Sequence, residues 1–431
     1  MNPTRDIIKA DLLIDGTEIS KIGRLSAKDL NGARVLDATD KIVAPGFVQT
    51  HIHLCQTLFR NLADDLELLD WLKLRIWPFE AAHTQKTIGL SARMGLTELI
   101  QCGTTTIMDM GTVHHTDYIF EEINRSGIRA LAGKAMMDEC PGAPSGLAES
   151  RSWSISECLN LKKTWHGSAG GRIRFAFAPR FVLSCSESLL GEVRDLAAEE
   201  SLIVHTHSSE NRSELEAVVA KCGVSNVEYF HRIGLTGERL CLAHCIWLNE
   251  REMAILRDTR TRVLHCPSSN LKLGSGIASV PEMLAQGIYV SLGADGAPCN
   301  NNLDIFQEMR LAALIQKPRL GPASLTAEQV YTMATLGGAN ALGLLHEVGS
   351  LEKGKKADVI LMDLERIHSS PQENVYSQIV YSGRSTDVQT VIADGRILMK
   401  DRQLRVWDQD EVRASVRPAI QNILRRLEHE V

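Results

Sequence analysis

The chain has 431 residues, of which 44% are hydrophobic and 23% are charged. This length allows one large barrel or two domains, and the composition is that of an ordinary globular protein. The net charge of −6 argues against a general nucleic-acid binder, because such proteins need a basic face to neutralise phosphates.

The N-terminal part of the chain has the pattern of short strands. Residues 7–24 alternate apolar and polar residues around Asp15-Gly16. This pattern predicts antiparallel strands joined by a turn.

Residues 45–53 have the pattern of a buried strand that ends in two histidines, His51 and His53. Side chains alternate between the two faces of a strand, so both imidazoles point the same way, about 6–7 Å apart. Two imidazoles at this spacing can bind one cation. Two structural histidines that hydrogen-bond to their neighbours would give the same pattern.

Strand-like and helix-like stretches then alternate along the chain. An amphipathic stretch at 66–76 and a helix through residues 88–99 follow the first strand. Further strands are expected at residues 104–110, 129–137, 172–178, 202–207, 240–244, 262–265 and 288–293. Eight strand–helix units predict an α/β fold, a (β/α)8 TIM barrel. A doubly wound sheet is disfavoured, because no Gly-x-Gly-x-x-Gly follows the first strand.

The C-terminal part returns to the character of the N-terminal part. Val359–Met362 and the residues around Asp394-Gly395 have the pattern of strands and a turn, and residues 410–430 have helical spacing. We therefore expect residues 1–44 and 346–431 to form one small β-sandwich domain beside a catalytic barrel at 45–345.

Several of the expected barrel strands end in residues that can bind a metal. His207 lies at the end of the fifth strand and Asp295 follows the eighth. A barrel gathers these ends on one rim, together with His51 and His53. Three neutral imidazoles and one carboxylate suit a catalytic zinc or iron and leave one position for water.

Proton transfer needs further groups beside such a metal. A divalent cation lowers the pKa of bound water to about 7. Glu210, just after the fifth strand, is expected to carry the proton to the leaving group, although a carboxylate at a helix N-terminus gives the same pattern. His244, at the end of the sixth strand, would hydrogen-bond the attacking oxygen or polarise the electrophile. Asp295 would bind the metal and also accept a proton from water.

Two further histidines lie near this rim. His205 shares the face of His207 and is a possible ligand, but we interpret it as a packed interior residue, one layer deeper. His265 ends the seventh strand, and a supporting or substrate-binding role for it stays open.

Motifs along nearly the whole chain resemble those of the amidohydrolase superfamily, in its aminohydrolase branch. They lie at residues 45–53, 58–65, 71–80, 103–106, 207–210, 265–273, 295–296 and 354–358. The branch includes deaminases of 5′-deoxyadenosine, methylthioadenosine and S-adenosylhomocysteine, guanine deaminase and the triazine hydrolases.

The resemblance implies a site and a cofactor. It implies one metal held by His51, His53, His207 and Asp295, with Glu210 and His244 as catalytic partners. Binuclear relatives carry a modified lysine on the fourth strand, but residues 172–178 contain no lysine. We therefore expect a single Zn²⁺ per chain, with Fe²⁺ as the alternative.

The expected substrate contacts mix two patterns. Glu80 matches the position that binds ribose hydroxyls in nucleoside deaminases, and a carboxylate can accept two O–H bonds from a diol. A surface glutamate at a helix end is the alternative interpretation. The stretches that contain Arg180 and Gln56 resemble guanine deaminase instead. Trp77, Asn270 and His244 complete the predicted set.

We therefore expect a deaminase of an adenine nucleoside, with 5′-deoxyadenosine as the first candidate. The alternative is a guanine, 8-oxoguanine or pterin deaminase, or an s-triazine hydrolase. The expected partner is a small purine or nucleoside, and we expect binding to neither nucleic acid nor membrane. From the family resemblance we expect the chain to form a homodimer or a homotetramer. A catalytically silent barrel would lack ligands or a proton carrier, and neither is missing.

The expected location is the cytoplasm. The ten cysteines are spread thinly over the chain and form no Cys-x-x-Cys pair. This pattern predicts free thiols in a reducing compartment. The first residues lack the apolar core of a signal peptide, and no run approaches the roughly 18 apolar residues of a membrane span.

Overall fold

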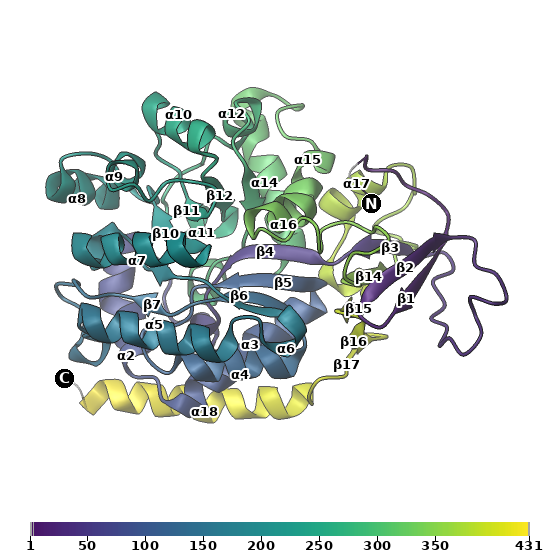
Figure 1. The fold of residues 1–431 in the computed structure, drawn as a ribbon, viewed down its shortest axis with the longest axis horizontal. Coiled ribbons are helices and arrows are strands. Elements are labelled where there is room, and N and C mark those ends of the chain that lie inside the picture. The colour runs from purple at the N-terminus through teal and green to yellow at the C-terminus, as the bar shows by residue number, and fades with distance from the viewer. Residues whose placement is uncertain (1, 3, 430–431) are drawn as a thin grey trace.

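The computed structural model describes residue 2 and residues 4–429. A ring of parallel strands lies inside a layer of helices, and antiparallel sheets from both chain ends lie together at one side (Figure 1). Among the described residues, no helix is long and apolar enough to cross a membrane.

Two parallel sheets close into the barrel. The first contains β4 (Phe47–Ile52), β5 (Thr104–Asp109), β6 (Arg129–Ala132) and β8 (Ile173–Phe175). The second contains β10 (Val204–Ser208), β11 (Leu240–His244), β12 (Arg262–His265) and β13 (Val290–Leu292). Parallel bridges at Phe177–Val204 and Ile52–Asp295 join the two sheets at both edges. The structure confirms the predicted (β/α)8 barrel.

The third and fourth barrel strands are interrupted, where the sequence predicts continuous strands. Short β7 (Ala135–Met136) and β9 (Ala178–Pro179) pair with each other beyond β6 and β8. At the break, a Cβ on Gly133 would lie 2.3 Å from the carbonyl oxygen of Ala176. The chains therefore approach too closely at this point for any residue larger than glycine.

Helices cover the outside of the barrel. The longer ones are α3 (Gln85–Gln101), α4 (Thr116–Ser126), α5 (Arg151–Trp165), α7 (Glu187–Glu200), α8 (Arg212–Cys222), α10 (Glu250–Thr259) and α14 (Ile305–Leu320). Shorter ones are α1 (Leu68–Trp71), α2 (Trp77–Ala81), α6 (Ser168–Gly171), α9 (Asn226–Arg232), α11 (Pro267–Lys272), α12 (Val280–Ala285), α13 (Ala297–Asn300), α15 (Ala327–Thr332), α16 (Gly338–Ala341) and α17 (Val375–Ser377). The remaining turns are the 3₁₀ segments η1 (Leu54–Phe59), η3 (Ser145–Leu147), η4 (Val182–Ser184) and η7 (Ser385–Asp387) and the π-helical segments η2 (Leu72–Ile76), η5 (Met333–Gly337) and η6 (Gln378–Ser382).

Both chain ends contribute to the antiparallel part. β3 (Ile42–Pro45) pairs with β14 (Val359–Met362), and the sheet continues through β15 (Val388–Ala393), β16 (Arg396–Lys400) and β17 (Gln403–Leu404). β1 (Asp11–Asp15) and β2 (Glu18–Gly23) form a hairpin. Ile19 of this hairpin is buried in one cluster with Val359 and Ile392 of the larger sheet. The small sandwich therefore has its own apolar core.

The last helix lies on the barrel, although the sequence assigns it to the sandwich domain. α18 (Gln409–His429) runs along the outside of α3, where Figure 1 shows it as a long yellow helix. Its Ile423 is buried beside Phe59 and Phe79. The division at 44/45 and 345/346 stays a prediction, and α18 contributes its apolar contacts to the catalytic part.

Candidate active site

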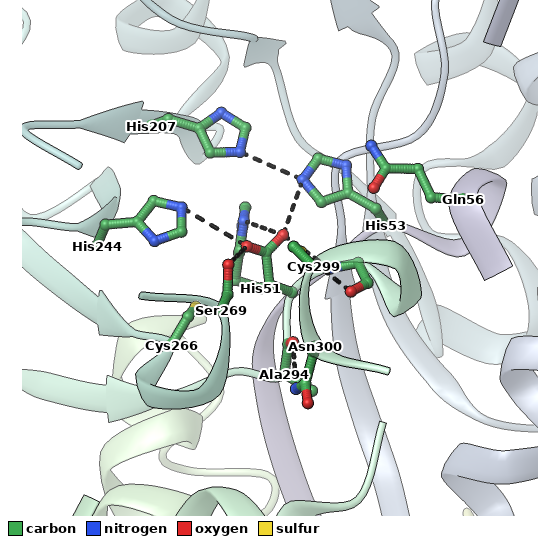
Figure 2. Close-up of polar contacts among 12 residues, drawn as sticks. His51, His53, Gln56, His207, His244, Cys266, Ser269, Ala294, Cys299 and Asn300 are labelled. Carbon is green, nitrogen blue, oxygen red and sulfur yellow. Dashed lines mark hydrogen bonds and ion pairs between the residues drawn. The ribbon is translucent and has the colours of Figure 1, made fainter. Parts of the chain in front are cut away.

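The four predicted metal ligands lie together on one rim of the barrel. One ligand atom from each of His51, His53, His207 and Asp295 lies within 4.8 Å of the other three. Figure 2 shows the rings of His53 and His207 turned toward the same space above His51. The backbone N–H of Asp295 donates to the carbonyl oxygen of His51 at 2.9 Å, so the first and eighth strands hold these side chains in register.

The spacing of these atoms fits a tetrahedral cation. Nε2 of His51 and Nε2 of His53 lie 3.3 and 3.4 Å from Oδ1 of Asp295. Nε2 of His53 lies 3.2 Å from Nε2 of His207. Ligands about 2.0–2.1 Å from a tetrahedral zinc are about 3.3–3.4 Å apart. Nε2 of His51 is buried and has no hydrogen-bond partner among the described residues, as expected of a ligand atom.

Burial sets the protonation states that a cation requires. It lowers the pKa of His53 and of His207 well below the usual range, so both imidazoles are neutral. Nδ1 of His207 lies 2.6 Å from the carbonyl oxygen of Arg180, which places the proton there and the lone pair on Nε2. Burial would raise the pKa of Asp295, but its contact with His51 outweighs this and holds the pKa well below its usual range.

Asp295 is also held by its neighbours. Ser269 Oγ donates to Oδ2 at 2.7 Å, and the N–H of Gly296 donates to Oδ1 at 2.7 Å. These bonds fix the carboxylate in one orientation and leave Oδ1 facing the histidines.

Glu210 and His244 form a second pair beside the predicted ligands. Nε2 of His244 lies 3.4 Å from Oε2 of Glu210 and 3.8 Å from Oδ2 of Asp295. Burial, with Asp295 and Glu214 nearby, raises the pKa of Glu210 well above its usual range. Burial lowers the pKa of His244 to about 4. Burial therefore favours the protonated form of Glu210 and the neutral form of His244.

Asn270, a predicted substrate contact, lies against His244. Its Oδ1 is 2.8 Å from Nδ1 of His244, so it accepts the ring proton there and leaves Nε2 of His244 facing Glu210. Nδ2 of Asn270 is buried without a partner among the described residues. Its contact in the structure therefore orients His244.

The backbone is strained at three residues of the site. Ser209, His244 and Asp295 have φ values of +53°, +73° and +63°. Non-glycine residues in the left-handed region cost about 1–3 kcal/mol each, and such strain gathers at functional sites. All three lie at or just after the ends of barrel strands, where the chain must turn sharply.

Gln56, Glu80 and Arg180 contact one another beside His53. Arg180 Nη1 lies 2.6 Å from Oε2 of Glu80, and Nη2 lies 3.2 Å from Oε1. Gln56 Nε2 donates to the same Oε1 at 2.9 Å, and Oε1 of Gln56 is buried without a partner among the described residues. Trp77 is buried in the apolar cluster next to this group, and its indole N–H likewise lacks a partner there.

A small cavity of about 30 Å³ lies among these groups. Its walls are His53, Gln56, Leu68, Trp71, Leu72, Arg180, Phe181, His207, Glu210, Glu214 and Asp295. A water molecule takes about 30 Å³ of liquid volume, whereas ligand pockets usually measure about 300 Å³ or more. Leu68, Trp71 and Leu72 together form an apolar wall of this cavity.

The sequence does not assign Phe181 or Glu214 to the site. It offers the segment 58–79, which contains the three apolar wall residues, only as a candidate lid over the substrate. The amphipathic stretch has Leu68, Trp71 and Leu72 at i, i+3 and i+4. This spacing predicts that the three side chains share one apolar face, and it could have pointed to them. Glu214 lies one helical turn after Glu210, and its Oε2 accepts the backbone N–H of Glu210 at 3.0 Å. It also accepts a bond from Nδ2 of Asn226.

The other two rim histidines are buried. His205 lies below His51, with its Nε2 2.7 Å from Nδ1 of His51. His265 has no hydrogen-bond partner for either ring nitrogen among the described residues, and burial lowers its pKa to about 3. Neither belongs to the four-residue cluster.

Known proteins resemble this chain along almost its whole length. A family model described as "Amidohydrolase family" matches residues 42–398. A 5′-deoxyadenosine deaminase of Methanothermobacter thermautotrophicus is 40% identical over 94% of this chain and 93% of its own. A 5-methylthioadenosine/S-adenosylhomocysteine deaminase of Syntrophomonas wolfei is 37% identical over 97% of this chain and 95% of its own. A zinc-bound adenosine deaminase structure from Xanthomonas campestris aligns with a TM-score of 0.89 at 30% identity, over 96% and 93%.

Proposed function

The chain belongs to the amidohydrolase family, and we propose that its substrate is an adenine nucleoside, with 5′-deoxyadenosine as the first candidate. It is a metal-dependent hydrolase that acts on a C–N bond and releases ammonia. The observation that carries the proposal is the cluster of three imidazoles and one carboxylate beside Glu210 and His244. The deaminases that match the chain over most of its length support the substrate class.

We propose that His51, His53, His207 and Asp295 hold one divalent cation, with zinc ahead of iron. Both metals accept imidazole and carboxylate ligands, so the donor set alone does not distinguish them. When bound, such a cation supplies a hydroxide nucleophile near neutral pH by lowering the pKa of water to about 7.

The surrounding residues would move the protons of the reaction. Asp295 accepts one proton from the attacking water through Oδ2 and later passes it to the departing amino group. Glu210 delivers its proton to the ring nitrogen next to the carbon under attack. His244 Nε2, held by Asn270, hydrogen-bonds the attacking oxygen. Water adds to C6 of adenine and the C6–N bond breaks. The remaining O–H proton returns to Glu210, and a 6-oxopurine and ammonia leave.

Glu80 is the proposed contact to the ribose. It lies next to Gln56 and Arg180, which both form walls of the cavity. A carboxylate can accept hydrogen bonds from two neighbouring hydroxyl groups. In this proposal Glu80 binds the 2′- and 3′-hydroxyls.

One observation favours a second candidate, a guanine, 8-oxoguanine or pterin deaminase or an s-triazine hydrolase. Both oxygens of Glu80 already bind Arg180, and one also binds Gln56. A diol would have to replace one of these bonds. The partnerless Oε1 of Gln56 suits an N–H at the edge of a planar ring instead.

Ammonia release from a panel of substrates separates the two candidates. The panel contains 5′-deoxyadenosine, methylthioadenosine, S-adenosylhomocysteine, adenosine and guanine. The proposal expects the highest kcat/KM for one of the nucleosides. Turnover of guanine alone would reject the nucleoside and support the second candidate.

Two wider expectations stay proposals. Ten free cysteines, eight of them buried, support a reducing compartment such as the cytoplasm. A homodimer or tetramer is expected at family level.

A further inference from the structure

His205 contacts a predicted metal ligand from below. It lies in β10, and its Nε2 reaches across the barrel interior to Nδ1 of His51 in β4, 2.7 Å away. Both side chains are fully buried, and their ring planes are perpendicular. At this distance the two nitrogens share a proton, so one ring donates and the other accepts.

The other nitrogen of His51 decides the direction of this bond. Nε2 of His51 faces the predicted ligand cluster, 3.3 Å from Oδ1 of Asp295. A nitrogen that binds a cation must present its lone pair, so the proton of a neutral His51 must lie on Nδ1. Nδ1 of His51 therefore donates, and Nε2 of His205 accepts.

The acceptor role fixes the tautomer of His205 as well. Its own proton must then lie on Nδ1, which is buried and has no partner among the described residues. A buried donor without a partner costs about 1–3 kcal/mol. A leucine at this position would avoid that cost, so packing alone does not account for a histidine here.

We propose that His205 is a positioning residue that holds His51 with its proton on Nδ1 and its Nε2 free for a divalent cation. The inference rests on the proposed metal site and adds a residue to it. Ligand histidines usually donate their second N–H to a carboxylate, a carbonyl or water. A neutral imidazole in this place orients the ligand without adding a negative charge, so the cation would keep more of its Lewis acidity.

The test compares zinc affinities of full-length variants. His205→Leu removes the acceptor, and His205→Gln offers an amide oxygen. His265→Leu is the matched control, a buried histidine at the end of β12 in the same sheet. Zinc binding to the metal-free proteins is measured by competition with a chromophoric chelator. His205→Leu is expected to bind zinc about 10–100-fold more weakly than wild type, as for other residues that support a ligand. His205→Gln should keep most of the affinity, and the control should match wild type.

The outcomes separate this inference from the proposed function. Equal zinc affinity of His205→Leu and wild type would overturn the role of His205 alone. A wild-type protein that binds no zinc would overturn the metal site itself.

A second measurement needs no variant. Nitrogen-15 NMR of the zinc-loaded wild type, labelled at histidine, reports which ring nitrogen carries each proton. The proposal expects a proton on Nδ1 of both His51 and His205. A proton on Nε2 of His205 would overturn it.

Discussion

Arg180 and Glu80 form a buried bidentate ion pair beside the predicted metal ligands. The two contacts measure 2.6 and 3.2 Å, and the side chains are 4% and 2% exposed. Gln56 donates to the same carboxylate. A carboxylate has about four acceptor sites and three are taken, so a substrate diol can donate both of its hydrogen bonds to Glu80 only by replacing one that Arg180 or Gln56 now makes.

Replacing Glu80 by Gln tests whether this carboxylate binds the ribose. If it does, kcat/KM for 5′-deoxyadenosine should fall about 10–100-fold, because hydrogen bonds to a charged group contribute about 1.5–3 kcal/mol. Activity on guanine, where present, should fall less. Steady-state ammonia release with both substrates measures the difference. Asp70→Asn, an exposed acid in α1, is the control. Equal losses on a nucleoside and on a free base would contradict the diol contact.

Replacing Arg180 by Met leaves Glu80 buried without its cation. Breaking a buried pair in this way costs about 3–5 kcal/mol, so the free energy of unfolding in urea should fall by that amount. Adding Glu80→Gln should recover part of the loss. The exposed pair Arg194–Asp195 is the matched control, and Arg194→Met should cost at most about 1 kcal/mol. An Arg180→Met protein as stable as wild type would show that the pair is not held in the folded protein.

Replacing Glu210 by Gln removes the proposed proton carrier while keeping the shape of its side chain. Activity should fall by about 10²–10⁴, the usual contribution of general acid–base catalysis. Metal content should not change, because Glu210 lies outside the four-residue cluster. Ammonia release and elemental analysis on one preparation measure both. Glu216→Gln, an exposed acid on α8, should keep both properties. Loss of metal with Glu210→Gln would place this residue among the ligands instead.

Glu214 gives stability a dependence on pH. Burial, with Glu252 nearby, raises its pKa from 4.5 to about 7, although Asn226 and backbone N–H groups act in the opposite direction. The folded state then binds this proton more tightly than the unfolded state. Stability from Glu214 therefore falls as pH rises from about 4.5 to 7 and is constant above.

The variant Glu214→Gln should lack this dependence. Its Oε1 can accept the N–H of Glu210, and its amide can donate to the partnerless Oδ1 of Asn226 after that amide turns over. Between pH 4.5 and 8, the free energy of unfolding of Glu214→Gln should increase by about 3 kcal/mol relative to that of wild type. Urea unfolding at several pH values measures the difference, with Glu216→Gln as the control. A difference that stays flat over this range would refute the raised pKa.

The barrel and its rim could be predicted because they follow from local patterns. Strand periodicity is visible in short windows, and a barrel brings strand ends together wherever they lie in the chain. His51, His207 and Asp295 could therefore be grouped although far apart in sequence. The breaks at Gly133 and at residues 176–177 could not be predicted, because they depend on how closely two neighbouring strands approach.

The pairing of Arg180 with Glu80 could not be predicted from the sequence for a similar reason. The two residues are 100 positions apart and lie on different elements. Each matched a different substrate pattern, and only the fold shows that they bind each other. The contact between His205 and His51 likewise joins opposite sides of the barrel and leaves no trace in local spacing.

Metal content shows whether His51, His53, His207 and Asp295 together bind one cation. Elemental analysis should be made on wild type, on Asp295→Ala and on the exposed control His346→Ala, all purified without chelators. The expected result is about one zinc or iron per chain in wild type and in the control, with ammonia release, and little metal or activity in Asp295→Ala. A full equivalent of metal in Asp295→Ala, or ammonia release by a metal-free wild type, would contradict it.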